Sequence, residues 1–255
     1  VLYAQTHSYQ DSVKNYLKAL KLNPNYFEAH NNIGVAYIGW KKYNKAIEFF
    51  DRAIQINPFY AEAYNNKGNA LKEKGEYQRV AECYKESINL DPNFTDAITN
   101  LGIIWDLMND FKKSERYFRQ ALTQDPRNTS TLYNLANCLF NARQYNKSIE
   151  VCEKIIDLDR SFYHAYNRIG LCHIQLENEE QARDFFEESI KINSDYSEGL
   201  TNYGFALQKL KNYSLAAIQF EKVLKIEPNS EKAFINLTKV YFDDGLGRPV
   251  SKFVP

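Results

Sequence analysis

The chain has 255 residues, and its 32 lysines and arginines balance its 32 aspartates and glutamates, so the formal net charge is zero. This balance argues against nucleic acid or an anionic membrane as the partner, and no run of 18 apolar residues predicts membrane insertion. The four cysteines form no C-x-x-C pair, and we interpret them as buried free thiols of a protein in a reducing, intracellular and cytoplasmic compartment.

Helical patterns begin at the first residues. We predict a helix that ends near Thr6 and a second from about Tyr9 to Leu22, whose apolar residues recur every three and four positions. From residue 27 one pattern recurs with a period of 34: a first helix (helix A), a turn, a second helix (helix B) and a proline, which cannot continue a helix. Arg160 and Ser194 stand at the proline position in two copies.

Residues at fixed offsets identify the pattern. In residues 27–60 they are His30, Ile33, Gly34, Tyr37, Ala46, Phe50, Ala53 and Pro58. This pattern resembles the tetratricopeptide repeat (TPR), and the resemblance implies an all-α, right-handed TPR superhelix (α-solenoid) with helix A lining the concave face. Six full units fit the chain, at 27–60, 61–94, 95–128, 129–162, 163–196 and 197–230.

The ends of the chain complete this predicted organisation. Residues 1–26 form a partial repeat and 231–244 a final helix A, so 1–244 read as one solenoid. Gly247 stands where the aromatic residue of a next helix B is expected, and we predict that 245–255 form an extended C-terminal tail. Because the chain begins inside a repeat, we also expect it to be a fragment of a longer protein.

Glycine recurs at the eighth position of the units, inside helix A, although it costs about 1 kcal/mol there relative to alanine. This recurrence predicts that helix B of the same unit approaches too closely for a side chain. A large residue at the twenty-fourth position, such as Phe50 or Phe118, is expected to fill the space between the helices. The unit at 129–162 departs from both rules, with Ala136 and Cys152.

The sixth position predicts a row of amides along the concave face. Arg168 interrupts this row, whose other members are Asn32, Asn66, Asn100, Asn134, Asn202 and Asn236. An asparagine side chain both donates and accepts hydrogen bonds, which suits the backbone of an extended peptide. The row is similar to the asparagine ladder in the TPR region of the O-linked N-acetylglucosamine transferase. Packing between adjacent A helices is an alternative role that the sequence leaves open.

Other groove positions change in character along the chain. Early units present mainly carboxylates, such as Glu28, Glu62 and Asp96, and we expect them to favour basic residues in the ligand. Later units present apolar residues, and exposed apolar groove residues usually mark a partner site. We predict that Phe140, Ile174 and Phe242 are apolar anchors. Leu171 and Phe205 also stand at groove positions of the later units. For these two residues, burial between neighbouring A helices competes with the interpretation as partner-binding residues.

Two predictions concern individual groove residues. We expect Arg168 to pair with an acidic group of the ligand. We also expect that replacing Asn100 and Asn134 with alanine weakens binding without unfolding the chain.

The sequence favours binding over catalysis. No P-loop, dinucleotide fingerprint or zinc-ligand spacing is present, and the adjacent Cys172 and His173 point apart on a helix, so we predict no enzyme activity, cofactor or metal. Asn134 and Arg168 match two members of the TPR clamp that binds chaperone C-termini, but Thr99 and His164 replace the expected lysines. RNA-binding pentatricopeptide repeats have a longer period and basic grooves, unlike this chain.

These observations predict a scaffold that holds an extended or helical segment of a partner protein in its groove, as a component of a larger complex. One alternative is a rigid spacer that contacts neighbours, including other copies of itself, by its outer faces. Another is the regulatory TPR part of an enzyme whose catalytic domain lies outside this chain.

Overall fold

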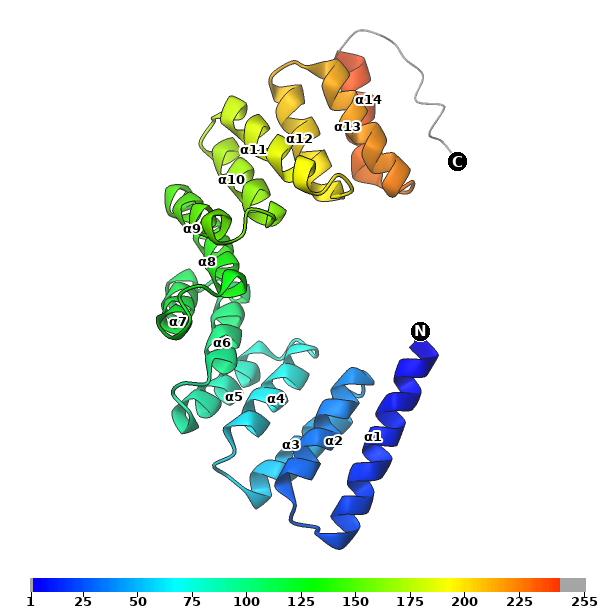
Figure 1. Ribbon diagram of the computed structural model, residues 1–255, viewed down its shortest axis with the longest axis vertical. Helices are drawn as coiled ribbons and strands as arrows, with labels where there is room; N and C mark the ends of the chain where they lie inside the picture. Colours follow the sequence, from blue (N-terminus) through cyan, green and yellow to red (C-terminus); the bar gives the residue numbers. More distant parts are fainter. Residues whose placement is uncertain (1, 244–255) are drawn as a thin grey trace. The chain divides into compact units, whose positions relative to one another are not determined.

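The computed structural model describes the backbone of residues 2–243 and the side chains of residues 8–243, and it consists of helices joined by short turns (Figure 1). In this part of the chain there are 14 α-helices and no strand, which confirms the predicted all-α fold class. The chain divides into two compact units, residues 1–126 and 127–255. The predicted tail at 245–255 lies outside the described residues.

The first unit begins with one long helix where the sequence predicted two. Helix α1 is continuous from Leu2 to Leu22, so the predicted break after Thr6 is wrong. No glycine or proline lies near that point, and nothing in the local sequence ends the helix. The other helices of this unit are α2 (Phe27–Gly39), α3 (Tyr43–Ile56), α4 (Ala61–Lys72), α5 (Tyr77–Leu90), α6 (Thr95–Leu107) and α7 (Phe111–Gln124).

The second unit consists of three further hairpins and a last A helix. Its helices are α8 (Thr129–Asn141), α9 (Tyr145–Leu158), α10 (Tyr163–Gln175), α11 (Glu179–Ile192), α12 (Ser197–Lys209), α13 (Tyr213–Ile226) and α14 (Glu231–Asp243). No helix within residues 2–243 combines the length and apolar character needed to cross a lipid bilayer.

Within each unit, the A helices lie next to one another. Each B helix packs against its own A helix and, where another A helix follows in the same unit, against that helix as well. Successive A helices also touch directly, as in the contacts of α2 with α4, α8 with α10, α10 with α12 and α12 with α14. The side chains that share a register position on these helices therefore line up along one face of each unit.

The recurrent glycines sit directly beneath the aromatic rings of the B helices. A Cβ built on Gly34 would lie 2.5 Å from the ring of Phe50, and one built on Gly102 would lie 2.7 Å from the ring of Phe118. Gly68, Gly170 and Gly204 meet Tyr84, Phe186 and Phe220 in the same way. The predicted close approach is therefore confirmed. Ala136 and Cys152, which replace this pair in one hairpin, are both fully buried.

Every turn from helix A to helix B within a hairpin uses a left-handed backbone at the fifteenth position. Gly75 has φ 75°, whereas the other five positions, Lys41, Asn109, Arg143, Glu177 and Lys211, have φ between 57° and 61°. A non-glycine residue in this region costs about 1 kcal/mol or more. The turn is kept because the next backbone N–H reaches back into helix A, as from Lys42 N to Tyr37 O at 2.8 Å.

Candidate functional site

The seven predicted ladder positions all lie on A helices. Asn32, Asn66 and Asn100 come from α2, α4 and α6 of the first unit, and the other four, Asn134, Arg168, Asn202 and Asn236, come from α8, α10, α12 and α14 of the second. All seven side chains are partly buried. Each of them therefore keeps some exposed surface.

Three ladder amides bind the preceding A helix. The Nδ2 of Asn66 donates to Oδ1 of Asn31 at 3.0 Å. Asn100 donates in the same way to Asn65 at 3.2 Å, and Asn202 to Asn167 at 3.0 Å. The acceptors are at most 5% exposed, so these bonds are shielded from water and join neighbouring A helices. The packing role that the sequence left open is thus present at these three positions.

This second row of asparagines, at the fifth position, was missed from the sequence. Asn31, Asn65 and Asn167 are spaced 35 residues before the ladder residues that they bind. The doublets Asn31-Asn32 and Asn65-Asn66 were a usable signal, because they place two amides side by side at one register of the repeat.

The same hydrogen bonds determine which side-chain atoms of the ladder remain free to bind a ligand. Asn100 uses its amide nitrogen on both Asn65 and Asn69, at 3.2 and 3.4 Å. Among the described residues, no donor binds the side-chain oxygens of Asn100 and Asn202. The ladder at these positions therefore presents acceptors, which match the N–H groups of a bound backbone.

Arg168, which interrupts the ladder, lies against one of the predicted anchors. Its guanidinium carbon is 4.7 Å from the ring centroid of Phe140, within the range of a cation–π contact. It also lies near Tyr133: burial raises the pKa of the Tyr133 phenol, and the Arg168 charge opposes this rise. Tyr133 is 35 residues before Arg168, so the two stand where three other pairs of A helices carry two asparagines.

The predicted apolar anchors differ in how much surface they keep. Phe242 is 85% exposed and Phe205 is 39% exposed. Ile174 and Leu171 are partly buried against the core that contains Phe186 and Ala206, so less of their surface faces a ligand. Ile235, which was missed, is 63% exposed and lies two turns before Phe242 on the same side of α14.

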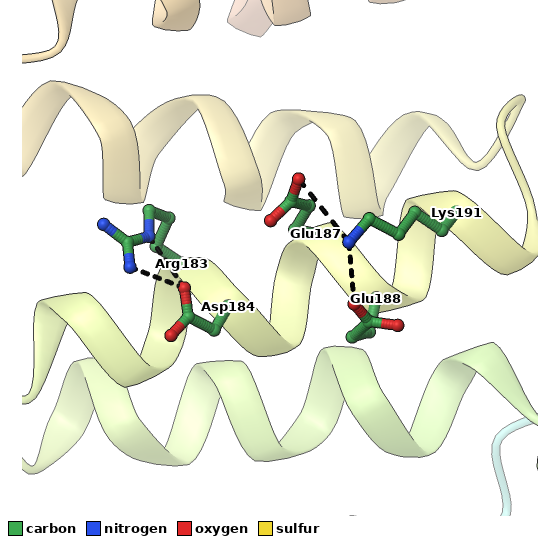
Figure 2. Close-up of polar contacts among 5 residues, drawn as sticks. All are labelled: Arg183, Asp184, Glu187, Glu188 and Lys191. Atoms are coloured by element: carbon green, nitrogen blue, oxygen red, sulfur yellow. Dashed lines mark hydrogen bonds and ion pairs between the residues drawn. The ribbon is translucent and has the colours of Figure 1, made fainter.

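The outer face of the second unit carries charged pairs along α11. Figure 2 shows Arg183 beside Asp184, and Lys191 reaching both Glu187 and Glu188, with nitrogen–oxygen distances of 2.6, 3.6 and 2.8 Å. Exposed ion pairs of this kind contribute only about 0–1 kcal/mol each. We interpret this stretch as a solvated surface. An apolar outer surface is found on α13, where Leu215 and Ile218 are 50% and 45% exposed.

The prediction that the cysteines are buried free thiols agrees with their surroundings, and His173 also packs on a neighbouring ring. All four cysteines are buried and free, which confirms that interpretation, and burial raises the pKa of the Cys83, Cys152 and Cys172 thiols. His173 stacks on Phe185 at 5.5 Å, and burial lowers its pKa. Within the described residues, no group of three or more His, Cys, Asp or Glu side chains is placed to hold a metal ion.

Family models match most of the chain. Models described as tetratricopeptide repeat match residues 27–60, 61–94, 95–128, 128–195 and 197–230, and a TPR repeat model matches residues 2–39. No curated protein sequence matches significantly.

Solved structures of similar fold include three repeat proteins. The C-terminal part of a TPR repeat-containing protein from Cytophaga hutchinsonii has TM-score 0.72 and 15% identity, covering 93% of this chain and 99% of that one. The APC/C hetero-tetramer Cut9–Hcn1 has a TM-score of 0.69 and 15% identity. The match covers 94% of this chain and 48% of that one, so this chain spans about half the length of that relative. YrrB, a TPR protein with an unusual peptide-binding site, has a TM-score of 0.57 and 21% identity, and the match covers 76% of this chain and 99% of that one. At these identities the likeness shows the fold alone.

Proposed function

Because the chain belongs to the tetratricopeptide repeat family, whose members are generally protein-interaction scaffolds, we propose that it binds a segment of a partner protein along its A helices. The bound segment is extended or helical, and the chain acts as one component of a larger complex. The free cysteines fit a reducing compartment, which we propose to be the cytoplasm.

The surface of α14 carries this proposal. Phe242 is 85% exposed, although it is large and apolar. Ile235 is 63% exposed and stands at the fifth position, which the following A helix covers at Asn31, Asn65 and Asn167. At 100° per residue, Ile235 and Phe242 share roughly a third of the helix circumference with Asn236 and Lys239. Exposed large apolar residues on one helix face usually mark a protein interaction site. Asn236 makes no side-chain hydrogen bond to another described residue, so its amide is available to a ligand.

The ladder supports the proposal in a restricted form. Oxygen atoms of Asn100 and Asn202 accept hydrogen bonds from the ligand backbone, while their amide nitrogens hold the A helices together. Phe140 and Arg168 act as one composite contact, an aromatic ring covered by a guanidinium. Similarity to the transferase ladder mentioned above is not needed for either contact.

The test is a quantitative pull-down from the native cell extract with two matched variants of the whole chain. The first, Ile235→Ala with Phe242→Ala, removes the apolar groove residues of α14. The second, Leu215→Ala with Ile218→Ala, removes outer-face residues of similar size on α13. We expect the main partner to be lost from the first variant and retained by the second. Thermal unfolding of both variants serves as the control for folding.

The outer-face residues Leu215 and Ile218 also favour a second candidate, the spacer that contacts neighbours by its B helices. The reverse pattern, with the partner lost only from the α13 variant, would overturn groove binding in favour of this role. Self-association is read from the same two variants by light scattering.

A further inference from the structure

A recess opens in the first unit between the N-terminal ends of α4 and α6. Its volume is about 470 Å³. Its lining includes Tyr60, Glu62, Asn65, Asn66, Phe94 and Asp96. The two asparagines belong to the amide rows on the A helices, so the recess adjoins the path of the proposed ligand.

The charge of the recess is one-sided. Asp91 also lines it, so three carboxylates face one space, and none of the lining residues is a lysine or an arginine. Glu28 lies close enough to raise the pKa of Tyr60, although burial and the bond to Glu62 are the larger causes. Asp96 forms no ion pair with any described residue. Several carboxylates without an internal cation create a negative potential that a cation would relieve.

The carboxylate of Glu62 is held in place before any ligand binds. The Tyr60 hydroxyl donates to its Oε2 at 2.8 Å, and Asn31 Nδ2 lies 3.5 Å from its Oε1. The Tyr60 ring is in turn fixed by an edge contact with Phe27, with centroids 4.9 Å apart. A pre-oriented carboxylate loses little freedom on binding, which strengthens a charge-assisted hydrogen bond.

Aromatic walls distinguish this recess from a metal site. Tyr60 and Phe94 occupy the last position of successive repeats and present rings beside the carboxylates. No group of three acidic or metal-ligating side chains in the described part of the chain converges closely enough to hold a metal ion. A planar guanidinium, by contrast, stacks on aromatic rings and pairs with carboxylates in one geometry.

We propose that this recess binds an arginine side chain of the partner segment, with Glu62 and Asp96 as the anionic contacts and Tyr60 and Phe94 as the stacking surface. This proposal rests on groove binding, the proposed function, because the arginine is carried by the bound segment. It specifies that the segment is basic where it passes α4 and α6.

The probe is N-acetyl-arginine amide, titrated into the ¹⁵N-labelled whole chain and followed through the side-chain amide signals of Asn65 and Asn66. N-acetyl-citrulline amide is the matched ligand, since it keeps the shape and lacks the charge. We expect shifts with the arginine compound and binding at least about fivefold weaker with citrulline, the range of one charge-assisted hydrogen bond.

Two variants complete the test. Asp96→Asn is expected to weaken binding of the arginine compound about fivefold or more. Glu82→Gln removes an equal charge on the exposed face of α5 and is expected to leave this binding unchanged. The proposal that this recess binds arginine would be overturned by any one of three results: no shift with the arginine compound, equal binding of the citrulline compound, or equally weakened binding in Glu82→Gln. Because the partner pull-down uses α14 and α13 variants, failure of the recess and failure of groove binding are observed separately.

Discussion

Both units consist of the same helical hairpin, but the first unit repeats it more regularly than the second. In the first unit, three hairpins repeat one arrangement: a glycine beneath the ring of Phe50, Tyr84 or Phe118, and asparagine pairs between successive A helices. The second unit changes this arrangement at three places. Ala136 with Cys152 replaces a glycine and a ring, and Arg168 with Tyr133 and Phe140 replaces an asparagine pair. Thr201 stands 35 residues before Asn236, where an asparagine would complete a further pair.

This difference teaches that the repeat changes by pairs of contacting positions. A methyl group at the eighth position requires a small residue at the twenty-fourth, because a ring there would lie within 3 Å of it. A guanidinium at the sixth position likewise comes with aromatic rings in place of an amide. The first two of these differences therefore involve contacting residues, and variants of the first unit can show whether the coupling is required.

The largest effect is expected from Gly102→Ala in the first unit. The added Cβ would lie 2.7 Å from the Phe118 ring, and relieving this overlap costs about 1–3 kcal/mol of the free energy of unfolding. Adding Phe118→Cys to this variant recreates the Ala136–Cys152 pair. We expect the double variant to be more stable than the sum of its single changes, as measured by chemical denaturation of the whole chain. Strict additivity would show that the positions are not coupled.

An effect of similar size separates ladder residues that join A helices from those that do not. Asn100→Ala leaves the buried Oδ1 of Asn65 without its donor, at a cost of about 1–3 kcal/mol. Asn236→Ala breaks no side-chain hydrogen bond with a described residue, so we expect a change within about 0.5 kcal/mol. Denaturant unfolding of both variants gives the comparison. Equal losses would mean that the Asn100 bonds do not stabilise the fold.

This contrast marks the limit of what the sequence could predict. The 34-residue period placed the hairpins and predicted the close approach at Gly34 and Gly102, because one steric requirement recurs in every unit. The period could not tell whether Asn100 faces a ligand or Asn65, since both residues lie on the inner side of their helices. The double change first expected to test binding alone, Asn100→Ala with Asn134→Ala, therefore also tests packing through Asn100, and Asn236→Ala is the cleaner test.

Local context set the other limits. The exposure of Ile235 and Phe242 depends on which side of α14 the core covers, and the hydrophobic pattern of one helix does not fix this. The recess between α4 and α6 requires residues from successive repeats, Glu62 and Asp96, to meet across a space. The sequence predicted their shared charge and their preference for basic ligands, but not the aromatic walls beside them.

The smallest effect concerns pH and is confined to the second unit. Burial lowers the pKa of His164 and His173, and Glu198 and Glu153 respectively oppose the shift. The unfolded chain therefore binds more protons than the folded one as pH falls through about 6.5, the ordinary value. Stability contributed by the neutral imidazoles is present above that pH and is lost below it.

We expect His164→Phe with His173→Phe to reduce the fall in melting temperature between pH 7.5 and pH 5. Because His173 already stacks on Phe185 and His164 contacts Tyr163 and Tyr196, phenylalanine keeps the ring contacts and removes only the titration. An unchanged fall would assign the acid sensitivity to the carboxylates of the chain, which the two units share.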